Sequence, residues 1–131
     1  MKYLLDTHIL LWVAIVPEKL SSEVLNLVEN PDNELIFSAA SIWEISIKSQ
    51  MGRDDFKVDA GVFRRSLIDN GYIELPIRSE HAAETYHLPI LHKDPFDRML
   101  IAQSFYEGIT LLTSDKLVCQ YSNSIVYASK S

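Results

Sequence analysis

The chain has 131 residues, 47% of them hydrophobic, with one cysteine and a formal net charge of −6. This length suits one domain, residues 1–131, with a core large enough to need neither a disulfide framework nor a zinc cluster. The acidic balance argues against a protein that coats nucleic acid through charge alone, because such proteins neutralise phosphates with basic surface.

The first predicted element is a short strand, Tyr3–Leu5, followed by a helix in the apolar stretch after Asp6. A signal peptide begins with a similar charged start and apolar run. Here Asp6 and His8 interrupt that run at once, and no cleavage site follows. No later run reaches the roughly 18 apolar residues that a membrane helix needs. We therefore expect a cytoplasmic protein with no membrane segment.

Helices and strands then alternate to the end of the chain. The expected helices are Ser21–Glu29, Ser41–Met51, Asp59–Asn70, Ser79–His87, Asp94–Gly108 and Lys116–Tyr121. The expected strands are Glu34–Ser38, Tyr72–Leu75, Ile109–Leu112 and Ser124–Tyr127, and a frayed tail, Ala128–Ser131, follows. This alternation predicts an α/β fold, with helices on both faces of a parallel sheet.

Four carboxylates stand at the borders of these elements. Asp6 and Asp115 each follow an apolar strand run, while Glu44 and Asp97 fall in the first turns of predicted helices. In a parallel α/β sheet these borders meet in one crevice, at the carboxyl ends of the strands. Acids gathered there repel one another unless a cation neutralises them, and an all-carboxylate set favours Mg²⁺ or Mn²⁺. The chain therefore predicts a metal-dependent reaction on a phosphate.

Three of these acids also have a capping alternative. Asp6 and Asp115 can each serve as the N-cap of the helix that follows. The sequence Ser41-x-x-Glu44 can form a capping box, in which Glu44 bonds a backbone N–H at the helix start. These alternatives stay open for each acid taken singly. The coincidence of all of them at one sheet edge favours the metal site.

A fifth acid, Asp94, precedes Pro95, and this pair is typical of a helix start with Asp94 as N-cap. We favour the capping role for Asp94. It lies three residues before Asp97, so both side chains can face one site.

Other catalytic motifs fit less well. The histidines show neither the HExxH motif nor the Cys/His spacing of a zinc site; they are His8, His81, His87 and His92. His8 can approach the site from beside Asp6, although a packed or capping role is favoured. A phosphatase of the haloacid-dehalogenase type needs an acid two residues after Asp6, where His8 stands. No Gly-rich phosphate loop or Gly-x-Ser-x-Gly elbow is present.

Four segments together resemble the PIN-domain ribonucleases, and in particular the VapC-type toxins of bacterial toxin–antitoxin modules. They are LLDTHILLW, SIWEISIK, DPFDRMLIAQ and LLTSD, in the order and spacing of that family over nearly the whole chain. The resemblance implies a three-layer α/β/α sandwich around a mainly parallel sheet. It also implies an acidic pocket for one or two Mg²⁺ or Mn²⁺ ions, and hydrolysis of RNA.

The resemblance assigns roles to six residues by position. The family's acids correspond to Asp6, Glu44, Asp97 and Asp115, an additional acid to Asp94, and a hydroxyl that orders the site to Thr113. We expect Asp6, Asp97 and Asp115 to be the principal metal ligands. Glu44 is expected to bind metal directly or to hold its water. No acid of the set is missing, so an active enzyme is expected.

Basic residues flank the acids, namely Lys48, Arg53, Lys93, Arg98 and Lys116. Lys48 and Arg98 are the predicted RNA contacts. Surface solvation is the alternative for most of the five, and an ion pair with a neighbouring acid is the alternative for Arg98.

The resemblance implies two protein partners, an antitoxin that covers the pocket and a second copy of the chain in a homodimer. Several aromatic residues give mild support to a dimer, although core packing is the default for each: Trp12, Trp43, Phe56 and Phe63. The rival readings are a non-catalytic PIN-like module, whose acids only grip a partner's basic residue, and a metal-dependent phosphatase.

Overall fold

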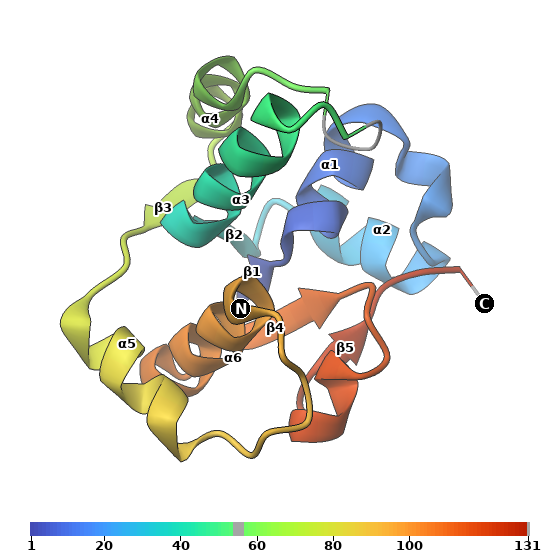
Figure 1. The fold of residues 1–131 in the computed structure, drawn as a ribbon. Helices are drawn as coiled ribbons and strands as arrows, with labels where there is room; N and C mark the ends of the chain where they lie inside the picture. The colour runs from blue at the N-terminus through green and yellow to red at the C-terminus, as the bar shows by residue number, and fades with distance from the viewer. Residues whose placement is uncertain (54–56, 131) are drawn as a thin grey trace.

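The structure, a computed structural model, describes residues 1–53 and 57–130. Its centre is a five-stranded sheet with the order β3-β2-β1-β4-β5, in which every neighbouring pair is parallel (Figure 1). The strands are β1 (Lys2–Leu5), β2 (Glu34–Ser38), β3 (Ile73–Leu75), β4 (Thr110–Thr113) and β5 (Val126–Tyr127). The predicted α/β fold with a parallel sheet is confirmed.

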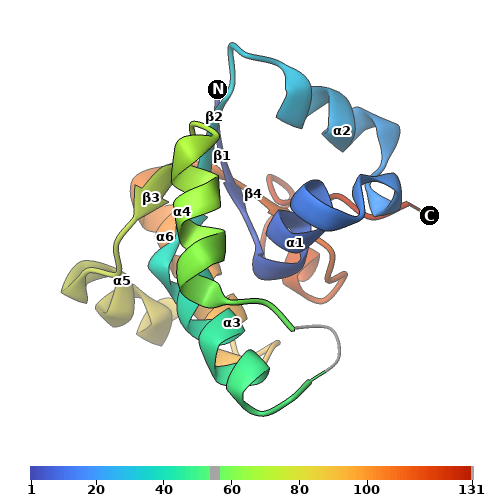
Figure 2. The ribbon, with the colours of Figure 1, turned by 90° about the horizontal axis from the view of Figure 1, so that it is seen from above.

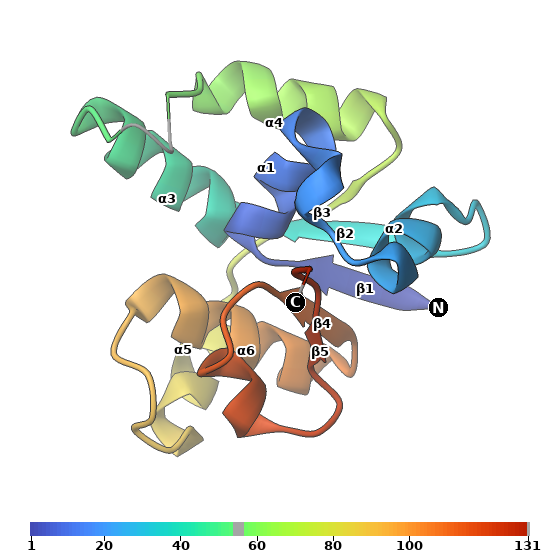
Figure 3. The same cartoon turned by 90° about the vertical axis from the view of Figure 1, so that its right-hand side faces the viewer.

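Helices cover both faces of this sheet (Figure 3). One face carries α1 (Thr7–Ile15), α2 (Ser22–Glu29), α3 (Ala39–Gln50) and α4 (Ala60–Asp69). The other carries α5 (Ser79–Glu84) and α6 (Pro95–Glu107), and short 3₁₀ turns occur at Pro17–Lys19, Thr85–His87 and Val118–Tyr121. Among the described residues, no helix has the length and apolar character needed to cross a bilayer.

The central strand shows how the sequence divides between the two layers of the core. Successive side chains of a strand point to opposite faces of the sheet. Accordingly, Tyr3 and Leu5 of β1 pack in the core beneath α1 to α4, and Leu4 packs in the core beneath α6. All three are buried, because β1 lies between β2 and β4 with a helical layer on each side. Asp6, the next residue, therefore emerges at the carboxyl end of the strand.

The start of α3 differs from the sequence prediction. Ser38, the last residue of β2, caps the helix by accepting the N–H of Ala40 at 3.0 Å. The helix therefore begins two residues before Ser41, which lies inside it and is buried. The capping box proposed for Ser41 and Glu44 is wrong, and Glu44 lies in the second turn of the helix.

The chain end also differs from the prediction, because residues 128–130 are held in place rather than frayed. Ala128 is buried and donates its N–H to the carbonyl of Thr113 at 2.8 Å. Lys130 donates its N–H to the carbonyl of Lys19 at 3.0 Å, and Figures 1 and 2 show this tail beside the start of α2. Residue 131 lies outside the described residues.

The aromatic residues named for a dimer separate into two groups. Phe63 is buried in the core, as expected by default, and Trp12 is partly buried against the same core. Trp43 is 59% exposed, which contradicts core packing for that residue. Phe56 lies outside the described residues.

Candidate active site

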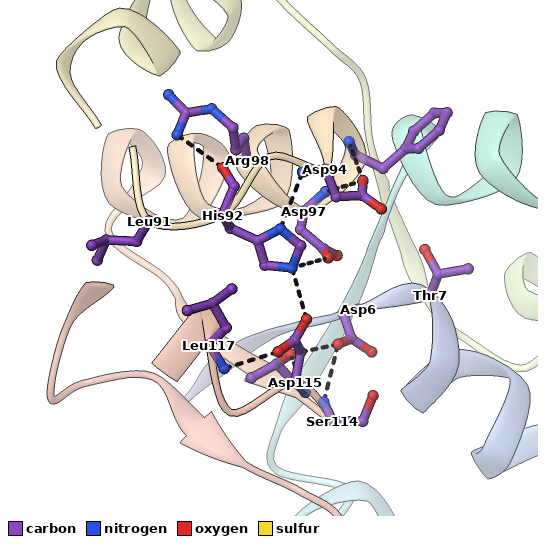
Figure 4. Close-up of polar contacts among 12 residues, drawn as sticks. Asp6, Thr7, Leu91, His92, Asp94, Asp97, Arg98, Ser114, Asp115 and Leu117 are labelled. Atoms are coloured by element: carbon purple, nitrogen blue, oxygen red, sulfur yellow. Dashed lines mark hydrogen bonds and ion pairs between the residues drawn. The ribbon is translucent and has the colours of Figure 1, made fainter. Parts of the chain in front are cut away.

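Five acidic side chains line one open pocket of about 530 Å³ at the carboxyl ends of β1 and β4. They are the five that the sequence placed at element borders, Asp6, Glu44, Asp94, Asp97 and Asp115. They come from the end of β1, from α3, from the start of α6 and from the turn after β4. Figure 4 shows four of them, Asp6, Asp94, Asp97 and Asp115. The expected gathering of these acids at one sheet edge is present in the structure.

Asp6 is both a helix cap and a pocket residue. One carboxylate oxygen, Oδ1, accepts the N–H of Ile9 at 2.9 Å and so caps α1. The other, Oδ2, accepts the hydroxyl of Thr113 at 2.6 Å and the N–H of Ser114 at 3.1 Å. The side chain is only 5% exposed, and burial raises the pKa of Asp6 against the lowering effect of these three bonds. Both interpretations of Asp6 made from the sequence are therefore compatible.

Thr113 connects two of the acids, Asp6 at the end of β1 and Asp115 in the turn after β4. Its hydroxyl donates to Asp6 and accepts the N–H of Asp115 at 3.1 Å. The side chain is fully buried, so water cannot take the place of Asp6 or Asp115 as a hydrogen-bond partner of this hydroxyl. This placement agrees with the ordering role expected for Thr113.

Asp115 holds the turn that precedes the next helical segment but is not its N-cap, which is Leu117. Its Oδ1 accepts the N–H of Leu117 at 2.8 Å, and its carbonyl accepts the N–H of Val118 at 3.1 Å. The regular helical segment here is the 3₁₀ turn Val118–Tyr121 rather than Lys116–Tyr121. The second oxygen, Oδ2, faces the pocket and contacts His92.

Glu44 is held by side chains from two helices. Its Oε1 accepts the hydroxyl of Thr7 at 2.6 Å, and its Oε2 forms an ion pair with Lys48 one turn further along α3. Glu44 is nearly buried, so these partners fix the direction in which it faces the pocket. Lys48 therefore lies in the pocket, as its expected role as an RNA contact requires.

The start of α6 brings two acids together. Asp94 accepts the N–H groups of Phe96 at 2.8 Å and Asp97 at 3.2 Å, with Pro95 in the first helical position. The favoured capping role of Asp94 is confirmed. Asp97 lies in the first turn, where burial, and then the charges of Asp94 and Asp6, raise its pKa to about 7. His92 partly offsets this rise.

His92 is a pocket residue that the sequence analysis missed. Its Nε2 lies 2.7 Å from Oδ2 of Asp115 and 3.1 Å from Oδ2 of Asp97 (Figure 4). Metal motifs with paired histidines do not include His92, which stands alone two residues before the capping Asp94. Its position at the same border as the acids was the available signal. His8, which the sequence placed beside Asp6, also lines the pocket.

Arg98 faces a loop rather than the acids. Its guanidinium donates to the carbonyls of Thr85 at 2.9 Å, Pro89 at 3.0 Å and His92 at 3.4 Å, and to the hydroxyl of Tyr121 at 3.3 Å. It is not among the described residues that line the pocket, whereas Lys116 is.

The donor set of the pocket fits a hard divalent cation. Carboxylate oxygens are the ligands that Mg²⁺ and Mn²⁺ prefer, and five carboxylates converge here. Burial, and then the charges of Asp94 and Asp6, raise the pKa of Asp97, so the charged form of this carboxyl is disfavoured in the pocket. A bound cation would favour the charged form.

Three comparisons relate the chain to known proteins. The family model described as PIN domain matches residues 3–123. No curated protein matches the chain in sequence. Three solved structures share its fold over nearly the full length of both chains, at identities too low to show more than the fold.

The first is a structure of VapBC2 from Rickettsia felis bound to a DNA fragment from their promoter. It is 14% identical, with a TM-score of 0.70, and the match covers 100% of both chains. The second is VapBC-1 from nontypeable Haemophilus influenzae, 16% identical with a TM-score of 0.61, covering 97% of this chain and 96% of that one. The third is a toxin–antitoxin complex from Klebsiella pneumoniae, 16% identical with a TM-score of 0.62, covering 95% of each chain.

Proposed function

The chain belongs to the PIN domain family, whose members are typically nucleases, and from this premise we propose that it is a metal-dependent endoribonuclease of the VapC type. One observation carries the proposal: carboxylates from four separate parts of the chain converge in one open pocket. That arrangement destabilises the empty fold through charge repulsion, so a function that uses the charges explains it.

Asp6, Asp97 and Asp115 would hold the cation, Mg²⁺ or Mn²⁺, with Glu44 as a further ligand or as the holder of its water. When bound, a divalent cation supplies charge neutralisation on the phosphate and a more reactive water at neutral pH. Asp6 and Asp115 are oriented by the hydroxyl and backbone of the β4 end, and Asp6 is fixed further by its cap of α1. These carboxylates are therefore in place before anything binds.

Lys48 and Lys116 are the residues that we propose to contact RNA phosphates, because both line the pocket. Lys48 is held by Glu44, so its ammonium group is directed beside the acids instead of into bulk solvent. Arg98 is committed to carbonyls of the loop before α6, and we assign it to the shape of the site. Selectivity for RNA would come from shape and contacts, since hydrolysis by activated water does not need the 2′-hydroxyl.

We further propose that an antitoxin protein covers the pocket in the cytoplasm. An open pocket lined by five carboxylates offers charge-assisted bonds to an Arg or Lys of such a partner. Toxin–antitoxin complexes are among the proteins that share this fold.

A homodimer is the second proposed assembly. Trp43 is largely exposed and contacts the ring of Phe96, with ring centres 5.2 Å apart. Together with Ile77, which is also exposed, these two residues line a small apolar pocket. An exposed apolar patch of this kind supports contact with a second protein surface. Light scattering on the purified chain, with Trp43→Ser as the variant, tests this assembly.

RNA cleavage by the metal-free protein, with and without added Mg²⁺ or Mn²⁺, tests the proposed function. We expect cleavage only with the metal, and at least a 100-fold loss in both Asp6→Asn and Asp97→Asn. The matched control is Asp69→Asn, the same change at an exposed residue at the end of α4, which should cleave like wild type. Metal-independent cleavage, or full activity in both pocket variants, contradicts the mechanism. RNA binding without cleavage favours the non-catalytic module.

A further inference from the structure

We propose that His92 is a positioning residue of the acidic pocket, whose Nε2–H donates a hydrogen bond to Asp115 beside Asp97 and so fixes the spacing of the two acids. In this role it orients two proposed metal ligands and does not itself bind the cation. The inference rests on the metal site proposed above, and it assigns a task to a side chain outside the acid set.

The hydrogen bond at the other ring nitrogen identifies where the imidazole carries its proton. His92 Nδ1 lies 3.1 Å from the backbone nitrogen of Asp94. A backbone N–H can only donate, so Nδ1 must accept, and the ring proton is on Nε2.

Nε2 is therefore a donor, and two carboxylate oxygens lie within its reach. Oδ2 of Asp115 is 2.7 Å away and Oδ2 of Asp97 is 3.1 Å away. One ligand atom from each of the three residues lies within 4.8 Å of the other two, a spacing that could hold a metal ion. However, a nitrogen that carries a proton has no lone pair for a cation. The cluster is therefore better described as a donor that is hydrogen-bonded to Asp115, with the carboxylate of Asp97 beside it.

The loop that carries His92 is fixed independently of the acids. The N–H of His92 donates to the hydroxyl of Tyr121 at 2.8 Å, and its carbonyl accepts from Arg98 at 3.4 Å. Arg98 also binds the carbonyls of Pro89 and Thr85, which anchors the same loop to α6. Backbone bonds on both sides of the ring thus hold Nε2 at its position, and a pre-set donor can orient ligands that would otherwise repel each other.

Asp115 and Asp97 belong to different elements, the turn after β4 and the first turn of α6. His92 is the described side chain that contacts both carboxylates. Without this donor, repulsion would separate the two acids, and a cation would have to bring them together at the expense of its own affinity. Loss of an orienting partner of this kind typically weakens metal binding 10- to 100-fold.

Nitrogen-15 NMR of the histidine rings tests the assignment directly, because the shifts report which nitrogen carries the proton. We expect His92 to be protonated on Nε2 and bare on Nδ1, both in the metal-free protein and after Mg²⁺ is added to saturation. A proton on Nδ1 in the metal-free protein, or loss of the Nε2 proton on adding Mg²⁺, would overturn the proposal in favour of a direct ligand.

Mn²⁺ binding measured by electron paramagnetic resonance on the metal-free protein tests the role. We expect His92→Ala to bind Mn²⁺ about 10- to 100-fold more weakly. His92→Gln retains an N–H donor and should stay within a few-fold of wild type. His87→Ala, which removes an exposed histidine of the preceding turn, should bind like wild type. Melting temperatures confirm that each variant is folded.

Two outcomes contradict the positioning role: unchanged affinity in His92→Ala, or an equal loss in His92→Gln and His92→Ala. The second would show that the ring itself is required. If wild type binds no Mn²⁺, the proposed function fails first, and the role of His92 toward a cation fails with it. The nitrogen shifts of the metal-free protein still decide the hydrogen-bond assignment in that case, so the two failures are distinguishable.

Discussion

Two sides of the same pocket hold their acids in different ways. On the strand side, at the ends of β1 and β4, Asp6 accepts three hydrogen bonds, one that caps α1 and two from the β4 end. On the helix side, at the start of α6, Asp97 faces the charge of Asp94 and meets Nε2 of His92. Burial raises the pKa of both acids, and that of Asp97 to about 7.

The difference separates an acid that supports both the fold and the proposed metal site from one that supports only the proposed metal site. On the strand side, backbone N–H groups and the hydroxyl of Thr113 donate to the carboxylate of Asp6, so this carboxylate also supports the fold. On the helix side, burial and the charges of Asp94 and Asp6 disfavour the charged form of Asp97, which lowers the stability of the metal-free protein at neutral pH. We therefore expect substitutions on the two sides to change stability in opposite directions, while both abolish cleavage.

The largest effect on stability is expected for Asp6→Ala. This change removes the cap of α1, worth about 1 kcal/mol, and leaves the donors of Thr113 and Ser114 without their acceptor. Removing a buried charge offsets part of the loss, so the free energy of unfolding should fall by about 2 kcal/mol. Urea denaturation without metal measures it. The control is Asp59→Ala, an exposed cap of α4, which should lose only about 1 kcal/mol. Equal losses in the two variants would contradict the structural role of the strand side.

Asp97→Asn should have the opposite sign and should depend on pH. The folded pKa of Asp97 is about 7, above the ordinary 3.8, so the unfolded state holds fewer protons between these values. Stability of the metal-free wild type therefore falls as pH rises from about 4 to 7 and stays reduced above 7. The full shift would correspond to roughly 4 kcal/mol, and screening by solvent reduces the expected loss to about 1–2 kcal/mol.

Urea denaturation of the metal-free protein at pH 5 and pH 8 measures this effect. Wild type should be more stable at pH 5, and Asp97→Asn should reduce the difference and exceed wild type at pH 8. The raised pKa of Asp6 has the same sign and should leave part of the difference in place. A variant that is less stable than wild type at pH 8 would show that Asp97, like Asp6, is held by the fold.

The smallest effect concerns the hydroxyl that joins β4 to Asp6. Thr113→Val has nearly the same shape but leaves Asp6 with one donor fewer and the N–H of Asp115 without its acceptor. We expect the free energy of unfolding to fall by about 1 kcal/mol in Thr113→Val. Thr113→Ser keeps the hydroxyl and should not show this loss. If Val is tolerated as well as Ser, the bonds at the β4 end do not stabilise the strand side.

Much of the fold follows from local patterns in the sequence. The strands are apolar runs, and the acids at their ends are polar residues at abrupt borders, so the gathering of the five carboxylates could be inferred from parallel topology alone. The start of α3 could not, because Ser38 and Ser41 are equally good caps in sequence. The choice between them depends on where β2 ends in the folded sheet.

The remaining differences come from contacts between segments that are distant in sequence. His92 reaches the acids because Tyr121 and Arg98 hold its loop, and no local pattern encodes those bonds. Ala128 is held by pairing with Thr113 at the end of β4. Such positions are set by tertiary structure, so the sequence predicted the residue types of the pocket better than the partners that fix them.

The most direct test measures metal occupancy and RNA cleavage in the same samples. Metal-free wild type and Asp97→Asn are titrated with Mn²⁺, bound metal is measured by electron paramagnetic resonance, and the cleavage rate is measured at each point. We expect cleavage by wild type to rise in proportion to bound Mn²⁺, and Asp97→Asn to lose both together. Cleavage that is already maximal without metal, or Mn²⁺ that binds fully with no cleavage of RNA, would contradict a metal-dependent nuclease built on this pocket.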